Sequence, residues 1–189
     1  HWDFNEPNAV LLKDKNFYID GFLRGNPQFV TDSGRQALSF NGSNQYVVVD
    51  RDVSELIDMT IDVWVKWEGN QAHERIFDFG SDSQNSMYLT PRGSSGRVEF
   101  VMTINGVQQR IIGTSQLPNT WTRVRVILSN GVGKLYVGNT LVGQSNIAFK
   151  PVQLGAKSFS NYIGRSQNGA YYFTGKIDDF KVYTSAIQP

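Results

Sequence analysis

Hydrophobic and polar residues alternate along most of the chain with a period of two. Val124, Val126 and Leu128 occupy every second position of one such segment, and residues 98–103 repeat the pattern. This period is typical of a strand that buries one face, because successive side chains of a strand point to opposite sides. Only residues 53–58 have the character of a helical turn. The pattern therefore predicts a protein built almost entirely of half-buried β-strands.

Short turn signals separate these segments. Asn-Gly pairs stand at 41–42, 105–106 and 130–131, and a Gly-Asn pair stands at 138–139. Such pairs supply the positive φ that tight hairpin turns require. Short strands with frequent turns predict an all-β, antiparallel two-sheet sandwich. No linker, repeat or low-complexity stretch interrupts the 189 residues, so we expect a single domain over residues 1–189.

Tryptophan is bulky and mostly buried in sandwiches of this kind. We expect Trp2, Trp64 and Trp121 in the core. Trp64 and Trp67 fall on opposite faces of one strand, so the position of Trp67 stays open.

Five parts of the sequence carry a resemblance to a known family. They are residues 38–49, 59–66, 121–126, 134–142 and a C-terminal pair, 161–167 with 175–183. In this order and at these distances they resemble the laminin G-like group of concanavalin A-like jelly-roll sandwiches, over nearly the whole chain. The resemblance implies that the N-terminal residues 2–4 pair with the last strand. It also implies a fold that mostly serves binding and supports sugar recognition more often than catalysis.

Composition narrows the function further. The chain is 40% hydrophobic and 19% charged, as in folded globular proteins, and its formal charge of +1 argues against nucleic acid as a partner. No apolar stretch approaches the roughly 18 residues that cross a bilayer, so we expect no membrane insertion. The absence of cysteine, with 13% aromatic residues, favours a secreted bacterial domain. No signal peptide precedes the strand-like start, which indicates a mature or excised domain.

Motifs for catalysis are missing. The histidines are His1 and His73, and there is no thiol. A glycosidase needs two carboxylates at one cleft, but the glutamates do not form the Glu-x-Asp-x-x-Glu strand of related jelly-roll hydrolases. The motifs of jelly-roll alginate lyases are absent as well. We therefore expect the domain not to be an enzyme.

A first candidate binding site lies in residues 71–80. His73, Glu74, Arg75 and Asp78 are expected to line a pocket, because an Arg fork and a carboxylate together can bind two vicinal hydroxyls. The segment resembles that of laminin G-like domains attached to bacterial glycoside hydrolases, including carbohydrate-binding module family 66. The alternative is that Glu74 and Arg75 form a surface pair of little energetic value.

A second candidate lies in the loop at 165–172. Arg165 and Gln167 supply polar groups, and Tyr171 and Tyr172 supply aromatic faces for a sugar ring. Arg110 could reach the same ligand across a concave sheet. In the related family this loop often carries an aromatic residue where Asn168 and Gly169 stand here, and the alternative is an ordinary connecting loop.

Two adjacent carboxylates, Asp178 and Asp179, stand near the end of the last strand. Hard oxygen ligands of this kind suit Ca²⁺, and many related sandwiches hold calcium where the first and last strands meet. We therefore expect a structural calcium site with Asn5 or Glu6 nearby. The alternative is that one carboxylate caps a bulge or pairs with a neighbouring cation.

Together these features favour a non-catalytic carbohydrate-binding module that recognises a polysaccharide or its terminal sugar. Such a module would be a monomer, covalently linked to the catalytic domain of a larger secreted bacterial carbohydrate-active enzyme. One alternative is a laminin G-like extracellular adhesion or protein-interaction domain, although eukaryotic examples usually carry a disulfide that this chain lacks. The other is a jelly-roll polysaccharide lyase or hydrolase.

Overall fold

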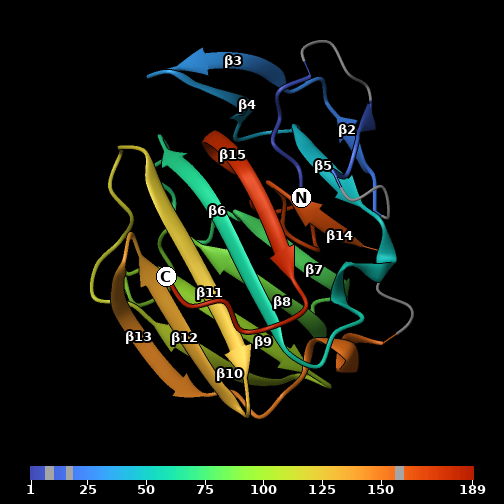
Figure 1. The fold of residues 1–189 in the computed structure, drawn as a ribbon, viewed down its shortest axis with the longest axis vertical. Helices are drawn as coiled ribbons and strands as arrows, with labels where there is room; N and C mark the ends of the chain where they lie inside the picture. The colour runs from blue at the N-terminus through green and yellow to red at the C-terminus, as the bar shows by residue number, and fades with distance from the viewer. Residues whose placement is uncertain (7–10, 16–18, 156–159) are drawn as a thin grey trace.

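Two antiparallel sheets lie face to face in the computed structural model, which describes residues 1–6, 11–15, 19–155 and 160–189. In Figure 1 the strands β6, β11 and β15 run in front and β7 to β10 lie behind them. Two single turns of 3-10 helix, η1 (Arg51–Ser54) and η2 (Pro151–Leu154), complete the described secondary structure. The predicted two-sheet jelly-roll sandwich is confirmed.

The order of strands differs from their order in the sequence, so distant segments become neighbours. The eight-stranded sheet has the order β1 (Leu11–Leu12), β2 (Gly21–Arg24), β5 (Tyr46–Val49), β14 (Asn161–Ile163), β7 (Phe77–Asp82), β8 (Asn85–Thr90), β9 (Glu99–Ile104) and β10 (Val107–Ile112). The seven-stranded sheet has the order β13 (Thr140–Asn146), β12 (Val132–Val137), β11 (Thr122–Ser129), β6 (Met59–Trp67), β15 (Thr174–Tyr183), β4 (Arg35–Asn41) and β3 (Gln28–Asp32).

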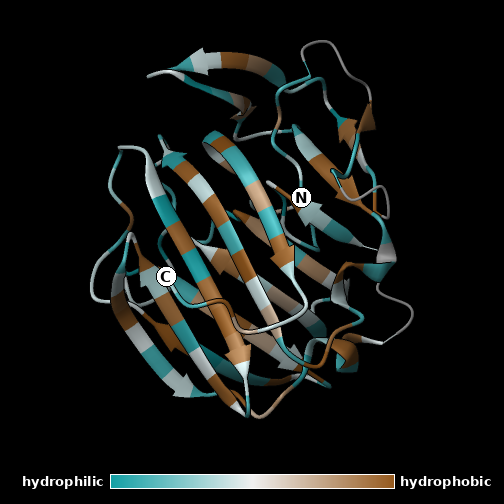
Figure 2. Cartoon of the chain, viewed as in Figure 1, coloured by the Kyte–Doolittle hydropathy of each residue, from teal (hydrophilic) through white to brown (hydrophobic). Residues whose placement is uncertain are grey.

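The core lies between the sheets and follows the period of two. Phe77, Leu89, Phe100 and Ile111 form one cross-strand row from β7 to β10, and each is 0% exposed. Figure 2 shows the same alternation as brown and teal bands along the front strands. Since every second residue is committed to the core, the residues between them are left for solvent or for a ligand.

Three of the four predicted turns form hairpins. Asn105 and Gly106 join β9 to β10 and Asn130 and Gly131 join β11 to β12, all four with positive φ, as a type I′ turn requires. Gly138, also at positive φ, joins β12 to β13. The hairpin predicted at 41–42 is wrong, because this pair connects β4 to β5 in the opposite sheet.

The tryptophans are distributed differently from the prediction. Trp2 and Trp67 are in the core, at 2% and 3% exposure, whereas Trp64 and Trp121 are only half-buried. Val63, Val65 and Trp67 share the inner face of β6, which puts Trp64 on the outer face. The prediction for Trp64 and Trp121 was therefore wrong.

The first residues of the chain meet the last strand, as the resemblance implied. Trp2 and Phe180 form an antiparallel bridge with two backbone hydrogen bonds of 2.9 Å. After β15 the chain turns across the outer face of the seven-stranded sheet (Figure 1), so the final residues lie over β11 rather than beside Trp2. Within the described part of the chain, no helix has the length and apolar character to span a bilayer.

Candidate functional site

The outer face of the eight-stranded sheet carries a row of polar and aromatic side chains. Tyr162, Asp78, Tyr88, Val101 and Arg110 stand opposite one another across β14, β7, β8, β9 and β10. They alternate with the buried row that starts at Phe77, so the strands that build the core also align these groups on the other side. The first and second candidate sites therefore meet on one surface.

Arg75 lies at the centre of this surface, just before β7. Its guanidinium stacks over the ring of Tyr88 at 3.7 Å and lies 5.6 Å from the ring of Tyr171. The Nη1 group donates a hydrogen bond of 2.5 Å to the carbonyl of His73, and Nε donates to Asp78 at 3.3 Å. With two aromatic faces and two acceptors around it, the guanidinium is held in one orientation.

Asp78 is a buried carboxylate, 2% exposed, beside Arg75. Its oxygens accept hydrogen bonds from Arg75 and from the backbone and side-chain amides of Gln167. Burial raises the pKa of Asp78 to about 6, although Arg75 and Gln167 act in the opposite direction. A carboxylate of this kind changes charge near neutral pH, and such groups are frequent at functional sites.

The loop at 164–172 covers one side of this surface. Arg165 and Tyr172 form a bridge at its base, and the Ser166 hydroxyl binds both the Tyr171 amide and the Asn168 side chain. These bonds fix the loop so that Gln167 can reach Asp78 and the carbonyl of Ser160. The loop therefore acts as a fixed wall of the site.

Loop and sheet together enclose a pocket of about 150 Å³. Its lining is polar except for the ring of Tyr88 and consists of Arg75, Asp78, Ser83, Ser86, Tyr88, Thr103, Gln108, Ser166, Gln167 and Asn168. Hydroxyl, amide, guanidinium and carboxylate groups thus point into one space, where they can donate to and accept from a polyhydroxyl ligand.

Glu74 does not line this pocket. Its carboxylate accepts hydrogen bonds from the Trp67 indole at 3.1 Å and from the backbone amides of Gln71 at 3.1 Å and Thr174 at 2.8 Å. It is 3% exposed, and Arg75 is 8% exposed, so the two side chains do not form the surface pair that was the alternative. Glu74 fixes the turn before β7 to β6 and β15, which sets the position of Arg75.

The other predicted residues lie around the pocket. The ring of His73 packs against Tyr171 at 5.4 Å, and burial and the nearby Arg75 lower its pKa. Arg110 is exposed at the far end of the row and donates to Gln108 at 2.5 Å. Tyr172 faces Tyr46 and Arg165 instead of the pocket. A role in ligand binding stays a prediction for all of these residues.

The sequence reasoning missed Tyr88, Ser86, Thr103 and Gln108. Ser86, Tyr88 and Thr103 alternate with core residues on β8 and β9, so the period of two already placed them on the outer face. Gln108 joins them because it stands opposite Thr103 on β10. The signal was available in the alternation, but without the strand order nothing connected them to Asp78.

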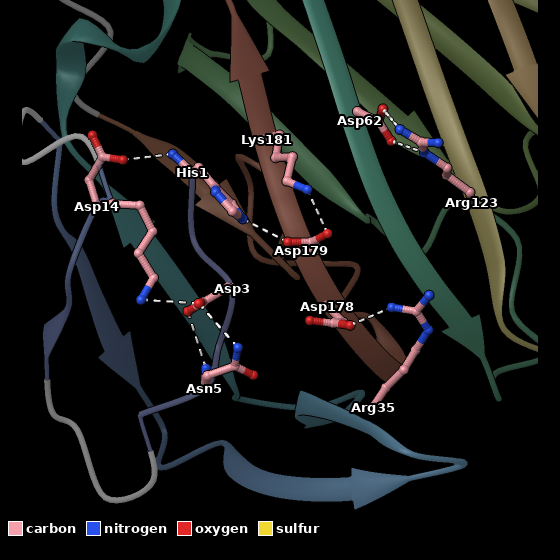
Figure 3. Close-up of polar contacts among 11 residues, drawn as sticks. His1, Asp3, Asn5, Asp14, Arg35, Asp62, Arg123, Asp178, Asp179 and Lys181 are labelled. Carbon is pink, nitrogen blue, oxygen red and sulfur yellow. Dashed lines mark hydrogen bonds and ion pairs between the residues drawn. The ribbon is translucent and has the colours of Figure 1, made fainter. Parts of the chain in front are cut away.

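The residues predicted for calcium do not fit an ion as they are placed. Figure 3 shows Asp178 pointing at Arg35, with an ion pair of 2.7 Å, and Asp179 between His1 and Lys181, each at 2.6 Å. Asn5 bonds to Asp3 instead of turning to these carboxylates. Over the described residues, no three His, Cys, Asp or Glu side chains converge as a metal site would require. The exposed Glu6 makes no contact with Asp178 or Asp179 among the residues described. Burial instead raises the pKa of Asp178.

Solved structures share this fold at low sequence identity. Domain 4 of AbnA, a GH43 extracellular arabinanase from Geobacillus stearothermophilus, in complex with arabinotriose, is 17% identical, with a TM-score of 0.84 over 100% of this chain and 92% of that one. The CBM40 of a Ruminococcus gnavus IT-sialidase is 18% identical, with a TM-score of 0.68 over 80% of this chain and 91% of that one. The binding domain of botulinum neurotoxin DC, in complex with rat synaptotagmin II, is 16% identical, with a TM-score of 0.71 over 99% of this chain and 48% of that one. At these identities the likeness shows the fold alone.

The sequence itself gives a family assignment. A search of curated proteins finds no match to the chain. A family model does match it, over residues 41–189, which include all the pocket-lining side chains. On this match, the chain belongs to the concanavalin A-like lectin/glucanases superfamily.

Proposed function

We propose that this domain is a non-catalytic carbohydrate-binding module whose pocket on the eight-stranded sheet holds one sugar ring. The proposal extends to a secreted parent protein in which the module accompanies a catalytic domain. The observation that carries it is the pocket around Arg75, Asp78 and Gln167, where fixed polar groups converge beside the ring of Tyr88.

The size and chemistry of the pocket support this reading. A volume of about 150 Å³ corresponds to about five water molecules at about 30 Å³ each, which suits a single sugar ring rather than a chain. Arg75 can donate to ring hydroxyls, Asp78 can accept from them, and Gln108 and Gln167 can do both. The ring of Tyr88 offers an apolar edge for the C–H groups of the sugar.

A binding role is favoured over catalysis by the carboxylates of the pocket. Asp78 is the one carboxylate in its described lining, and Glu74 is occupied behind it by Trp67, Gln71 and Thr174. Glycoside hydrolysis by the usual routes needs two carboxyl groups facing the scissile bond. Two of the similar structures, the arabinotriose complex and a CBM40 bound to α2,3 sialyllactose, hold saccharides on this fold, which supports a sugar as ligand.

The proposal can be tested with a glycan array followed by calorimetric titration of the best hit. Gln108 is exposed on β10 and Asn168 is exposed on the loop, so replacing either by Ala should not unfold the domain. We expect each substitution to weaken binding about tenfold, as for the loss of one or two hydrogen bonds. Gln144→Ala, an equally exposed change on β13 of the other sheet, is the control. Unchanged affinity in both pocket variants would rule out this pocket.

A further inference from the structure

Next to the pocket, Arg165 is packed among tyrosines without an acid to neutralise it. Its guanidinium carbon lies 4.8 Å from the ring centre of Tyr46 and 4.6 Å from that of Tyr162. The rings of Tyr46 and Tyr162 meet edge to face at 5.5 Å, and Tyr172 lies 6.2 Å from Tyr46. Arg165 and these three tyrosines form an arginine–tyrosine cluster.

The guanidinium of Arg165 has a side-chain hydrogen bond to Tyr172 but no acid partner among the described residues. Its Nε is buried and has no hydrogen-bond partner among the described residues, and no carboxylate there forms an ion pair with it. Buried polar groups in native proteins are nearly always bonded, so an unbonded one calls for an explanation. The residue as a whole is half-buried, which leaves part of its side chain in reach of solvent.

The cluster borders the sugar pocket directly. Tyr162 stands opposite Asp78 in the β14–β7 pair, and Arg165 precedes Ser166 and Gln167, which line the pocket. A ligand whose ring occupies the pocket can therefore extend a neighbouring group or ring over Tyr162 to Arg165.

Two further arginines on this face of the molecule have no acid partner among the described residues. Arg24 stands opposite Tyr46 in the β2–β5 pair, and Arg110 ends the row across β10, and neither forms an ion pair with any described carboxylate. Among the carboxylates of β7 and β9, Asp78 and Glu99 are buried and already hydrogen-bonded. Asp82, at the end of β7, is exposed and accepts hydrogen bonds from the backbone amides of Gln84 and Asn85.

The outer face of the opposite sheet has another arrangement, because most of its cations are matched by acids, with Lys134 as an exception among the described residues. The ion pairs there are Asp62 with Arg123 and Arg125, Asp178 with Arg35, Asp179 with Lys181, and Lys66 and Lys176 with Asp32 and Glu68. Although the formal net charge is only +1, three arginines that are unpaired within the described chain, Arg24, Arg110 and Arg165, thus gather on the outer face of the eight-stranded sheet.

We propose that Arg165 binds the carboxylate of an acidic sugar residue, as a subsite adjoining the pocket. A guanidinium presents parallel N–H groups that match the two oxygens of a carboxylate. The tyrosines offer ring faces to the sugar and exclude water from the ion pair, which strengthens it. The inference rests on the proposed function and narrows its ligand to acidic glycans.

The test compares acidic oligosaccharides with the same oligosaccharides after their carboxyl groups are reduced to alcohols. A glycan array identifies the best acidic ligand, and calorimetry measures its affinity and that of its reduced form. We expect wild type to bind the acidic form at least tenfold more tightly, and this preference to decrease as NaCl is added. Equal affinity for the two forms, or tighter binding of a sulfated oligosaccharide, would overturn the carboxylate assignment.

Substitutions of Arg165 test whether this residue causes the preference for the acidic ligand. Arg165→Gln should reduce the ratio of the affinities for the acidic and the reduced form to about twofold or less, and Arg165→Lys should retain part of the preference. Lys134→Gln is the control, because Lys134 lies on β12 of the opposite sheet and also has no acid partner among the described residues. Thermal melting checks folding, and the salt dependence of wild type needs no variant at all. A preference that survives in Arg165→Gln would refute the proposal.

The two proposals fail in different ways. If the reduced sugar binds as well as the acidic one and Gln108→Ala weakens the binding of both, the sugar-binding function stands and the acidic subsite is wrong. If wild type binds no glycan of either kind, the proposed sugar-binding function is wrong, and so is the acidic subsite that rests on it.

Discussion

At the scale of single residues, three donors converge on the carboxylate of Glu74. The Trp67 indole and two backbone amides, of Gln71 and Thr174, come from parts of the chain up to 100 residues away. A carboxylate with three such bonds organises the turn that presents Arg75. Its contribution is therefore to the shape of the site, before any ligand arrives.

We expect Glu74→Ala to lower the free energy of unfolding by about 3 kcal/mol, because buried donors lose an ionised acceptor. Glu68→Ala should change the same quantity by no more than about 0.5 kcal/mol, since exposed ion pairs such as Glu68–Lys176 contribute little. Urea titration of both variants gives the comparison. Equal effects would mean that the hydrogen bonds of Glu74 do not stabilise the fold.

Asp78 links stability to pH, because its pKa is about 6 in the folded protein and has an ordinary value of 3.8. Between these values the folded state binds a proton that the unfolded state has released. This group therefore stabilises the fold fully below about pH 4, and the effect is lost as pH rises through about 6. The size is at most about 3 kcal/mol.

The check is a comparison of wild type with Asp78→Asn in urea at pH 4.5 and pH 7.5. Relative to the variant, wild type should be more stable at the lower pH. The comparison removes the contribution of Asp20 and Asp32, whose pKa values are lowered by Lys13 and Lys66 and which act in the opposite direction. A difference between the two proteins that does not change with pH would refute the assignment.

At the scale of elements, the C-terminal segment is attached to the outer face of the seven-stranded sheet. The buried hydroxyl of Thr60 on β6 donates to the Ser185 carbonyl at 2.7 Å and accepts from the Ile187 amide at 2.9 Å. Arg125, held by Asp62, donates to the Ile187 carbonyl at 3.3 Å. The segment thus covers a buried charge cluster that the sequence alone did not indicate.

Replacing Thr60 by Val keeps the shape of the side chain and removes both hydrogen bonds. We expect faster amide exchange over residues 184–189 and a loss of about 1–2 kcal/mol in the free energy of unfolding. Thr122→Val is the control, because the half-buried Thr122 hydroxyl bonds, among the described residues, to the nearby Thr120 carbonyl alone. Exchange in the segment that matches wild type would show that other contacts hold it.

At the scale of the whole molecule, the meeting of the first and last strands is held by ion pairs within the protein. Arg35 and Lys181 form ion pairs with Asp178 and Asp179, the two carboxylates expected to bind calcium. We therefore expect neither EDTA nor added Ca²⁺ to shift Tm by more than about 1 °C, since a ligand of the folded state must raise its stability. A calcium-dependent rise in Tm, scanned by calorimetry, would show that the ion displaces these cations.

Alternation along each strand is local, so the sequence by itself determined the all-β class, the core face of strands such as β11 and three of the hairpin turns, although not the inner face of β6. It also identified Arg75, Asp78 and Gln167, because charged and amide groups beside apolar strands are visible in the sequence. Glu74 was expected to line the pocket but lies behind it, since its partners Trp67 and Thr174 are brought to it only by folding.

Only the tertiary structure decided which outer faces adjoin. The order β14, β7, β8, β9, β10 joins Tyr162, Asp78, Tyr88 and Arg110 into one row, and no local pattern specifies that order. The same holds for ion pairing: Arg35 finds Asp178 across 143 residues, whereas Arg165 meets tyrosines instead of an acid. The sequence specifies the chemistry of each side chain. The partners of each group depend on which strands pair, and strands that are far apart in the sequence pair only when the whole fold forms.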